Sequence, residues 1–170
     1  MRKSGSASAA ALVFVLAFAA GGCWRYGFAG GGLPSHVRTF AVVPFENQTP
    51  SPEVSREVTD GLRVAVESRL GLRLASEEKA DAIFRGVIVR YDPDTPVAFS
   101  SDATRSTQVR RRLEIVVDAE LYDQVAGKVL WTKKGIMAPA DYGDRGEAEG
   151  RKQALQKIIS EVIEGAQSQW

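Results

Sequence analysis

Residues 108–122 read QVRRRLEIVVDAELY, a stretch in which apolar and polar side chains alternate. From Leu113 to Leu121 every second side chain is apolar, and most of those between are acidic. Alternation with a period of two is typical of a β-strand that has one buried and one solvated face. A turn-forming segment at 123–128 and a second β-rich run at 129–136 follow, so the sequence predicts a long antiparallel hairpin.

Two amphipathic helices are predicted elsewhere in the chain. The first covers residues 52–70, where apolar residues recur at spacings of three and four, and Gly71 is expected to end it. Ser51 provides an N-cap and Pro52 fits the first helical position. The second helix covers residues 148–167 and shows the same spacing. Each helix therefore presents one apolar stripe that must be buried.

The remaining segments alternate between short β-rich runs and polar connections. Further strands are predicted at residues 37–45, 72–75 and 82–91, and loops at residues 92–106 and 139–146. Gly86 interrupts a strand, which indicates a bulge or a close approach of other atoms to the backbone. The order of elements predicts an α+β fold, a two-layer sandwich with two helices packed on one face of a mainly antiparallel sheet of about four to five strands.

Residues 1–22 have the composition of a secretory signal peptide. Two basic residues follow Met1, residues 9–20 are apolar, and two glycines directly precede Cys23, the only cysteine in the chain. The apolar run is shorter than the roughly 20 residues that a membrane-spanning helix needs, so a transmembrane anchor is the lesser interpretation.

Small residues directly before a cysteine resemble the bacterial lipobox, in which the thiol is acylated and the signal peptide removed. Position 20 is Ala, where the lipobox usually carries Leu, and an ordinary signal peptide followed by an unrelated cysteine is the alternative. We predict that Cys23 is the lipid anchor, since two or three acyl chains hold a protein firmly on a membrane. Trp24 rather than Asp follows the cysteine, which by resemblance to the bacterial sorting rule points to the outer membrane.

The mature chain would begin at Cys23. Residues 23–36 would contain the lipidated cysteine and a glycine-rich tether, and residues 37–170 a single α+β domain. Removal of the signal peptide takes two of the 22 Lys and Arg residues and none of the 21 Asp and Glu residues, leaving a net charge of −1. This balance disfavours a nucleic-acid-binding protein. With the thiol acylated, no disulfide can form, so the fold must rest on its hydrophobic core.

The sequence offers little for catalysis or metal binding. His36 is the only histidine, and no nucleophile and carboxylate are spaced to suggest a triad with it. One histidine without a free cysteine does not make a typical zinc site, and the acidic residues lack the spacing of a calcium loop. We therefore predict a protein that is not an enzyme and needs no metal or cofactor, with His36 as a surface residue.

Arg110, Arg111 and Arg112 form the densest positive charge in the chain. On a strand, Arg110 and Arg112 would share the solvated face, and Arg111 would lie at the entrance of the apolar face. Two interpretations stay open: the charges protect the strand end against edge pairing, or the guanidinium groups bind phosphate or carboxylate. Lys133 and Lys134 on the returning strand would add positive charge if the register brings them near.

Four blocks of the mature chain carry a family resemblance. They are residues 23–28 (CWRYGF), 39–49 (TFAVVPFENQT), 80–86 (ADAIFRG) and 127–131 (GKVLW). In this order they resemble the lipopolysaccharide-assembly lipoprotein family, LptE. The resemblance implies a non-enzymatic lipoprotein on the periplasmic face of the outer membrane, which sits inside a large β-barrel partner, LptD, binds lipopolysaccharide and helps deliver it to the outer leaflet. Lipopolysaccharide phosphates would suit the arginine triplet, which is assigned from its charge and not from a family motif.

Other envelope lipoproteins show a similar opening strand. Residues 42–47 (VVPFEN) also resemble curli-secretion pore subunits and activators of peptidoglycan synthases. In these alternatives the chain would be a subunit of an oligomeric channel or a binding module for a synthase. A lipid-modifying hydrolase is a third class, which the missing nucleophile-and-base set disfavours.

Overall fold

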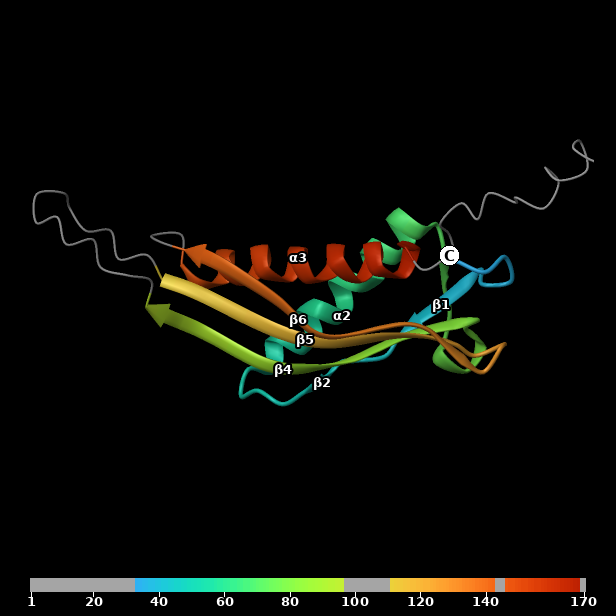
Figure 1. The fold of residues 1–170 in the computed structure, drawn as a ribbon, viewed down its shortest axis with the longest axis horizontal. Coiled ribbons are helices and arrows are strands. Elements are labelled where there is room, and N and C mark those ends of the chain that lie inside the picture. Colours follow the sequence, from blue (N-terminus) through green and yellow to red (C-terminus); the bar gives the residue numbers. More distant parts are fainter. Residues whose placement is uncertain (1–32, 97–110, 143–145, 169–170) are drawn as a thin grey trace, which may run out of the picture. The chain divides into compact units, whose positions relative to one another are not determined.

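A mixed β-sheet forms one layer of the structure, and two helices form the other (Figure 1). This computed structural model describes residues 33–96, 111–142 and 146–168. The strands are β1 (Thr39–Val42), β2 (Glu46–Asn47), β3 (Arg73–Leu74), β4 (Ala82–Pro96), β5 (Arg111–Asp123) and β6 (Lys128–Tyr142). The helices are α2 (Pro52–Ala65), its continuation as the π-helix η2 (Val66–Leu70), the short 3-10 helix η3 (Glu77–Lys79), and α3 (Glu147–Ser168).

The strand order of the sheet is β3-β1-β4-β5-β6, and β2 also pairs with β4. The β4, β5 and β6 strands are antiparallel, whereas β1 is parallel to β3 and β4, and β2 is parallel to β4. The α+β class is confirmed, but the predicted sheet is wrong in its strand number and in being mainly antiparallel. The reason is α2, which carries the chain back along the sheet, so that the strand after it runs parallel to the strand before it.

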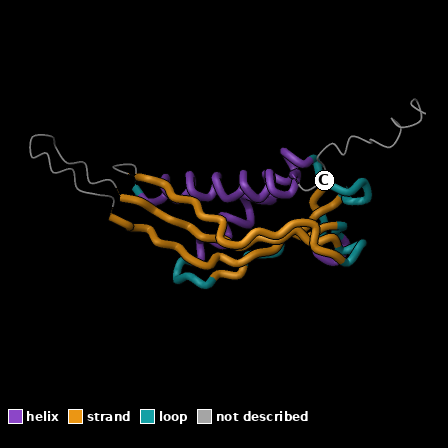
Figure 2. The backbone as a smooth tube through the Cα atoms, viewed as in Figure 1, coloured by secondary structure: helices purple, strands orange, loops and turns teal. Residues whose placement is uncertain are grey.

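The hairpin predicted from residues 108–122 consists of β5 and β6, which run side by side along α3 (Figure 2). The apolar members of the alternation are buried, namely Leu113, Ile115, Val117, Ala119 and Leu121. Both long strands that flank β5 extend beyond their predicted ends, into segments that were expected to be loops. Asp92 and Pro139 both lie opposite Glu114. Pairing with β5 therefore holds polar and proline-containing residues in a strand, against their intrinsic preference.

The first predicted strand, residues 37–45, is divided in two. β1 ends at Val42 and β2 begins at Glu46, with Pro44 between them. Proline has no N–H to donate to a sheet, so pairing stops around it. The first predicted helix has its expected ends, because Ser51 precedes α2, Pro52 begins it, and Gly71 with a φ of 66° follows η2. Ser51 occupies the N-cap position, but its side chain makes no capping hydrogen bond.

Gly86 lies on the core side of β4, between the buried side chains of Phe84 and Ile88. A Cβ atom at this position would lie 2.3 Å from the carbonyl oxygen of Asp118 and 2.4 Å from a ring carbon of Phe45. The close approach predicted for this glycine is confirmed. The ring of Phe45 occupies the space that a side chain at position 86 would need, and it fills the core between the sheet and α2.

Candidate functional site

Two arginines of the triplet are described, and both lie at one end of the long strands. Arg111 Nη1 is 3.0 Å from Asp94 Oδ2. The Arg112 guanidinium binds Asp141 through two hydrogen bonds, with Nε 2.7 Å from Oδ1 and Nη2 3.3 Å from Oδ2. We refer to these four residues as the arginine end. Arg110, like the predicted lipid site at Cys23, lies outside the described residues.

All four side chains of the arginine end are substantially exposed, with relative exposures of 53% and 52% for the Arg111–Asp94 pair and of 40% and 44% for the Arg112–Asp141 pair. The hydrogen bond that Arg112 donates to Asp141, and then the charge of that carboxylate, raise the pKa of the Arg112 guanidinium. Exposed ion pairs are weak because water competes for both partners. A phosphate, which also accepts two parallel hydrogen bonds from a guanidinium, can therefore take the place of a carboxylate here.

Further arginine–carboxylate pairs cross the face of the sheet that the helices do not cover. Arg85 Nη2 lies 2.5 Å from Glu120 Oε1, and Arg90 Nη2 lies 2.5 Å from Glu114 Oε1. The Arg85 guanidinium also stacks on the ring of Tyr122, at 5.0 Å from its centroid. These arginines are thus paired with carboxylates, so an anion could bind them only by displacing a carboxylate.

Lys133 and Lys134 do not join the arginine end. Lys133 lies opposite Ala119 in the middle of the hairpin and forms an ion pair with Glu161 of α3. It precedes Asp141 by eight residues on β6, which corresponds to about 26 Å along the strand. The additional positive charge that the sequence suggested is therefore far from the arginines.

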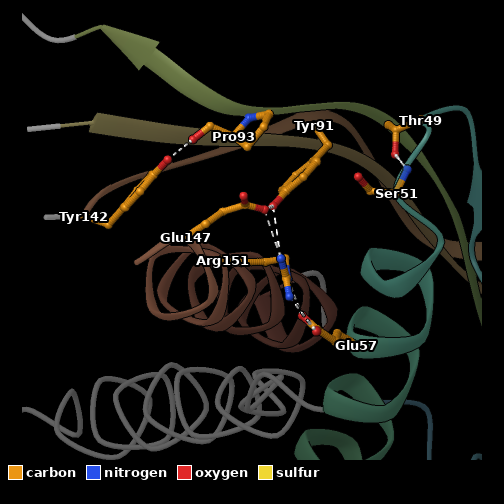
Figure 3. A network of polar contacts seen from close by, with 8 residues as sticks. All are labelled: Thr49, Ser51, Glu57, Tyr91, Pro93, Tyr142, Glu147 and Arg151. Carbon is orange, nitrogen blue, oxygen red and sulfur yellow. Dashed lines mark hydrogen bonds and ion pairs between the residues drawn. The ribbon is translucent and has the colours of Figure 1, made fainter. Parts of the chain in front are cut away.

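A polar network that the sequence analysis missed joins α2, α3 and β4 around Arg151 (Figure 3). The Arg151 side chain is only 16% exposed. Its Nε and Nη2 donate to the two carboxylate oxygens of Glu57, at 3.0 and 3.3 Å. Its Nη1 lies 3.1 Å from Glu147 Oε1 and 3.3 Å from the hydroxyl oxygen of Tyr91, which itself donates to Glu147.

The electrostatics of this network match its geometry. Burial, and then the hydrogen bond to Glu147, raise the pKa of Tyr91 to about 12, so the phenol keeps its proton near neutral pH. The carboxylate of Glu57 is the main cause of a raised pKa of the Arg151 guanidinium. Only the spacing of four between Glu147 and Arg151 could have indicated part of this network in the sequence. The network fastens the two helices to the sheet.

His36 has a specific partner rather than being only a surface residue. Its Nε2 lies 2.7 Å from Oδ2 of Asp123, whose side chain is fully buried, while the histidine side chain is 41% exposed. The other carboxylate oxygen of Asp123 accepts the N–H of Ala126 at 2.8 Å. Burial acts to raise the pKa of Asp123, but the hydrogen bonds from Ala126 and His36 outweigh it and the pKa is lowered. The arrangement joins the chain before β1 to the β5–β6 turn.

The described ranges contain neither a metal-binding cluster nor a membrane-spanning helix. Within residues 33–96, 111–142 and 146–168, no group of three or more His, Cys, Asp and Glu side chains could hold a metal ion. In the same ranges, the helices are too short or too polar to cross a membrane.

Comparison with known proteins gives a family and a fold. A family model described as LptE, lipopolysaccharide-assembly, matches residues 37–166. No curated protein sequence matches the chain. Among solved structures, the PelC dodecamer from Paraburkholderia phytofirmans aligns with a TM-score of 0.52 and 16% identity, covering 81% of this chain and 93% of that one. The hypothetical protein CT253 from Chlamydia trachomatis aligns with a TM-score of 0.50 and 11% identity, covering 75% and 96%. At these identities the structural likeness concerns the fold alone.

Proposed function

Because the chain belongs to the LptE lipopolysaccharide-assembly family, we propose that it partners an LptD-like β-barrel translocon in the delivery of lipopolysaccharide to the outer leaflet. The observation that carries this proposal is the family match, which spans the whole sheet and nearly all of α3. In the proposal the protein is not catalytic, and it acts by binding its partner and its lipid. It is held on the periplasmic face of the outer membrane by acyl chains on Cys23, the residue that follows the predicted signal peptide.

Purification of the protein with its neighbours tests the partner. A carboxy-terminal tag on the full chain, solubilised from outer membranes in mild detergent, is expected to recover a large β-barrel protein in a stable ratio together with lipopolysaccharide. The partners are identified by mass spectrometry and the ratio by quantitative gel analysis. A Cys23→Ser variant is the control, because it is expected to be lost from the outer-membrane fraction. Recovery of a peptidoglycan synthase, or of a homo-oligomeric ring without a barrel, would reject the proposal in favour of the alternative lipoprotein classes.

We further propose that the arginine end binds the phosphates of lipopolysaccharide. Arg111 and Arg112 are exposed, and each already holds a carboxylate in the geometry that a phosphate oxygen would use. Arg110 precedes them in the sequence. In this proposal Asp94 and Asp141 keep the guanidinium groups in place before the lipid arrives and are then displaced by it.

Replacing all three arginines by serine is expected to weaken lipopolysaccharide binding about tenfold or more, which corresponds to a loss of about 1.4 kcal/mol or more. The measurement is direct binding of labelled lipopolysaccharide to the purified protein, with thermal unfolding as a check of the fold. Arg85→Ser is the matched control, since Arg85 has a similar exposure of 54% and a carboxylate partner but lies away from the arginine end. An Asp94→Asn, Asp141→Asn double variant should bind more tightly, because the competing carboxylates are gone. Unchanged affinity in both variants would rule out this end as the anion site.

A further inference from the structure

The described chain enters its domain at the end of the sheet that carries the β5–β6 turn. Leu33, the first described residue, packs against the hydrophobic core. The backbone N–H groups of Arg38 and Thr39 donate to Asp81 Oδ2 at 2.9 and 2.8 Å. These hydrogen bonds lower the pKa of Asp81, with the one from Arg38 contributing most. The position at which the chain leaves the domain toward its amino terminus is thereby fixed.

A hydrogen bond between His36 and Asp123 lies at the same end of the sheet, and we refer to it as the clasp. Both carboxylate oxygens of Asp123 are used, one by His36 and the other by the N–H of Ala126 in the turn. Because Asp123 is fully buried, it cannot turn outward to exchange these partners for water without exposing its surroundings. The clasp therefore ties the entering chain to the turn.

The arginine end lies at the opposite end of the same strand. β5 begins at Arg111 and ends at Asp123, so the two residues are separated by about 40 Å of extended chain. The ten residue steps from Cys23 to Leu33 span at most about 35 Å. A lipid on Cys23 therefore restrains the end with the clasp much more closely than it restrains the arginine end.

The turn presents exposed apolar side chains at this restrained end. Val125, within the turn, is 65% exposed, and Val129, at the beginning of β6, is 45% exposed. Lys128 stands between them in the sequence. Exposed apolar side chains suit the boundary between phospholipid headgroups and acyl chains, where they leave water.

We infer that the β5–β6 turn is a phospholipid-contacting surface, on which Val125 and Val129 meet the membrane and which the His36–Asp123 clasp holds toward it. This inference rests on the proposed acylation of Cys23. With the turn on the membrane and β5 directed away from it, the arginine end lies up to about 40 Å from the lipid surface. That separation is several times the Debye length of about 8 Å at physiological ionic strength, so in this orientation the arginines face a partner or a transported lipid rather than the charge of the anchoring leaflet.

Site-specific fluorescence quenching tests the orientation on the full, acylated protein. Cys23 is the only cysteine in the chain, so a Val125→Cys variant has one free thiol for an environment-sensitive dye once Cys23 is acylated. Asp94→Cys, at the arginine end, is the matched labelling site because its side chain is 52% exposed. Both variants are bound to vesicles of phosphatidylethanolamine and phosphatidylglycerol that contain a lipid-attached quencher. We expect quenching to be several-fold stronger at position 125 than at position 94, and His36→Ala to reduce the quenching at position 125.

Flotation of the vesicles and the mass of the Cys23 peptide separate the two possible failures. If the acylated protein floats with the vesicles but the dye is quenched equally at positions 125 and 94, the anchor holds and the lipid-contacting turn is refuted. If Cys23 carries no acyl mass and the protein does not float, the anchor itself is refuted, and the membrane-facing turn is refuted with it.

Discussion

Gly86→Ala is expected to lower the free energy of unfolding by about 3 kcal/mol, at the upper end of what overpacking a core usually costs. The new Cβ would lie 2.3 Å from the carbonyl oxygen of Asp118 and 2.4 Å from the ring of Phe45. The carbonyl belongs to the neighbouring strand, so relief requires β4 and β5 to separate or Phe45 to leave the core. For a domain of this size, the loss should reduce the melting temperature by about 10 °C, measured by circular dichroism on a soluble Cys23→Ser background.

Gly61→Ala is the matched control for this substitution. Its new Cβ would lie 2.6 Å from the terminal Cδ1 of Ile159 and 3.9 Å from Cγ1 of the same side chain, and that methyl group can move away by a change of rotamer. Alanine also favours the interior of α2 by up to about 1 kcal/mol relative to glycine. We therefore expect an unchanged or slightly raised melting temperature. If Gly86→Ala behaved like Gly61→Ala, the close packing of Phe45 over β4 would be wrong.

The fold was predictable where one segment carried its own pattern. The alternation in residues 113–121 predicted β5 and its buried face, and the spacing of apolar residues predicted both helices. The arrangement of the strands could not be predicted, because parallel pairing of β1 with β4 depends on the path of α2 between them. The full lengths of β4 and β6 could not be predicted either, since Asp92 and Pro139 are in strands only through their pairing with β5.

The candidate site shows the same division between local pattern and long-range contact. Consecutive arginines are visible in a sequence, and their placement at a strand end followed from the alternation next to them. Their partners Asp94 and Asp141 come from two other strands, and the sequence alone does not give the register that brings them together. His36 and Asp123 are 87 residues apart in the chain, so no spacing rule connects them. Clusters assembled from distant segments require the structure.

Arg151→Met is expected to lower the free energy of unfolding by about 1 to 2 kcal/mol, because it removes a guanidinium that is only 16% exposed and leaves the carboxylates of Glu57 and Glu147 without their shared cation. Methionine keeps the apolar stem of the side chain, so the loss reports the guanidinium rather than lost packing. Urea unfolding of the soluble Cys23→Ser background gives the difference. The spacing of four between Glu147 and Arg151 alone would account for only about 0.5 kcal/mol, so the size of the loss separates a local helix pair from a connection between layers.

A double-mutant cycle measures how strongly Glu57 and Arg151 are coupled in the free energy of unfolding. Glu57 belongs to α2 and Arg151 to α3, and they are 94 residues apart in the chain. Glu57→Gln combined with Arg151→Met should therefore be less destabilising than the sum of the single variants, with a coupling of about 1 kcal/mol or more. Arg112→Ala is the control: its guanidinium also binds a carboxylate through two hydrogen bonds, but in solvent, and the melting temperature should not change measurably. A network that fastens the helices to the sheet must show this contrast, and additive single effects at Glu57 and Arg151 would mean that the helices are held by their apolar stripes alone.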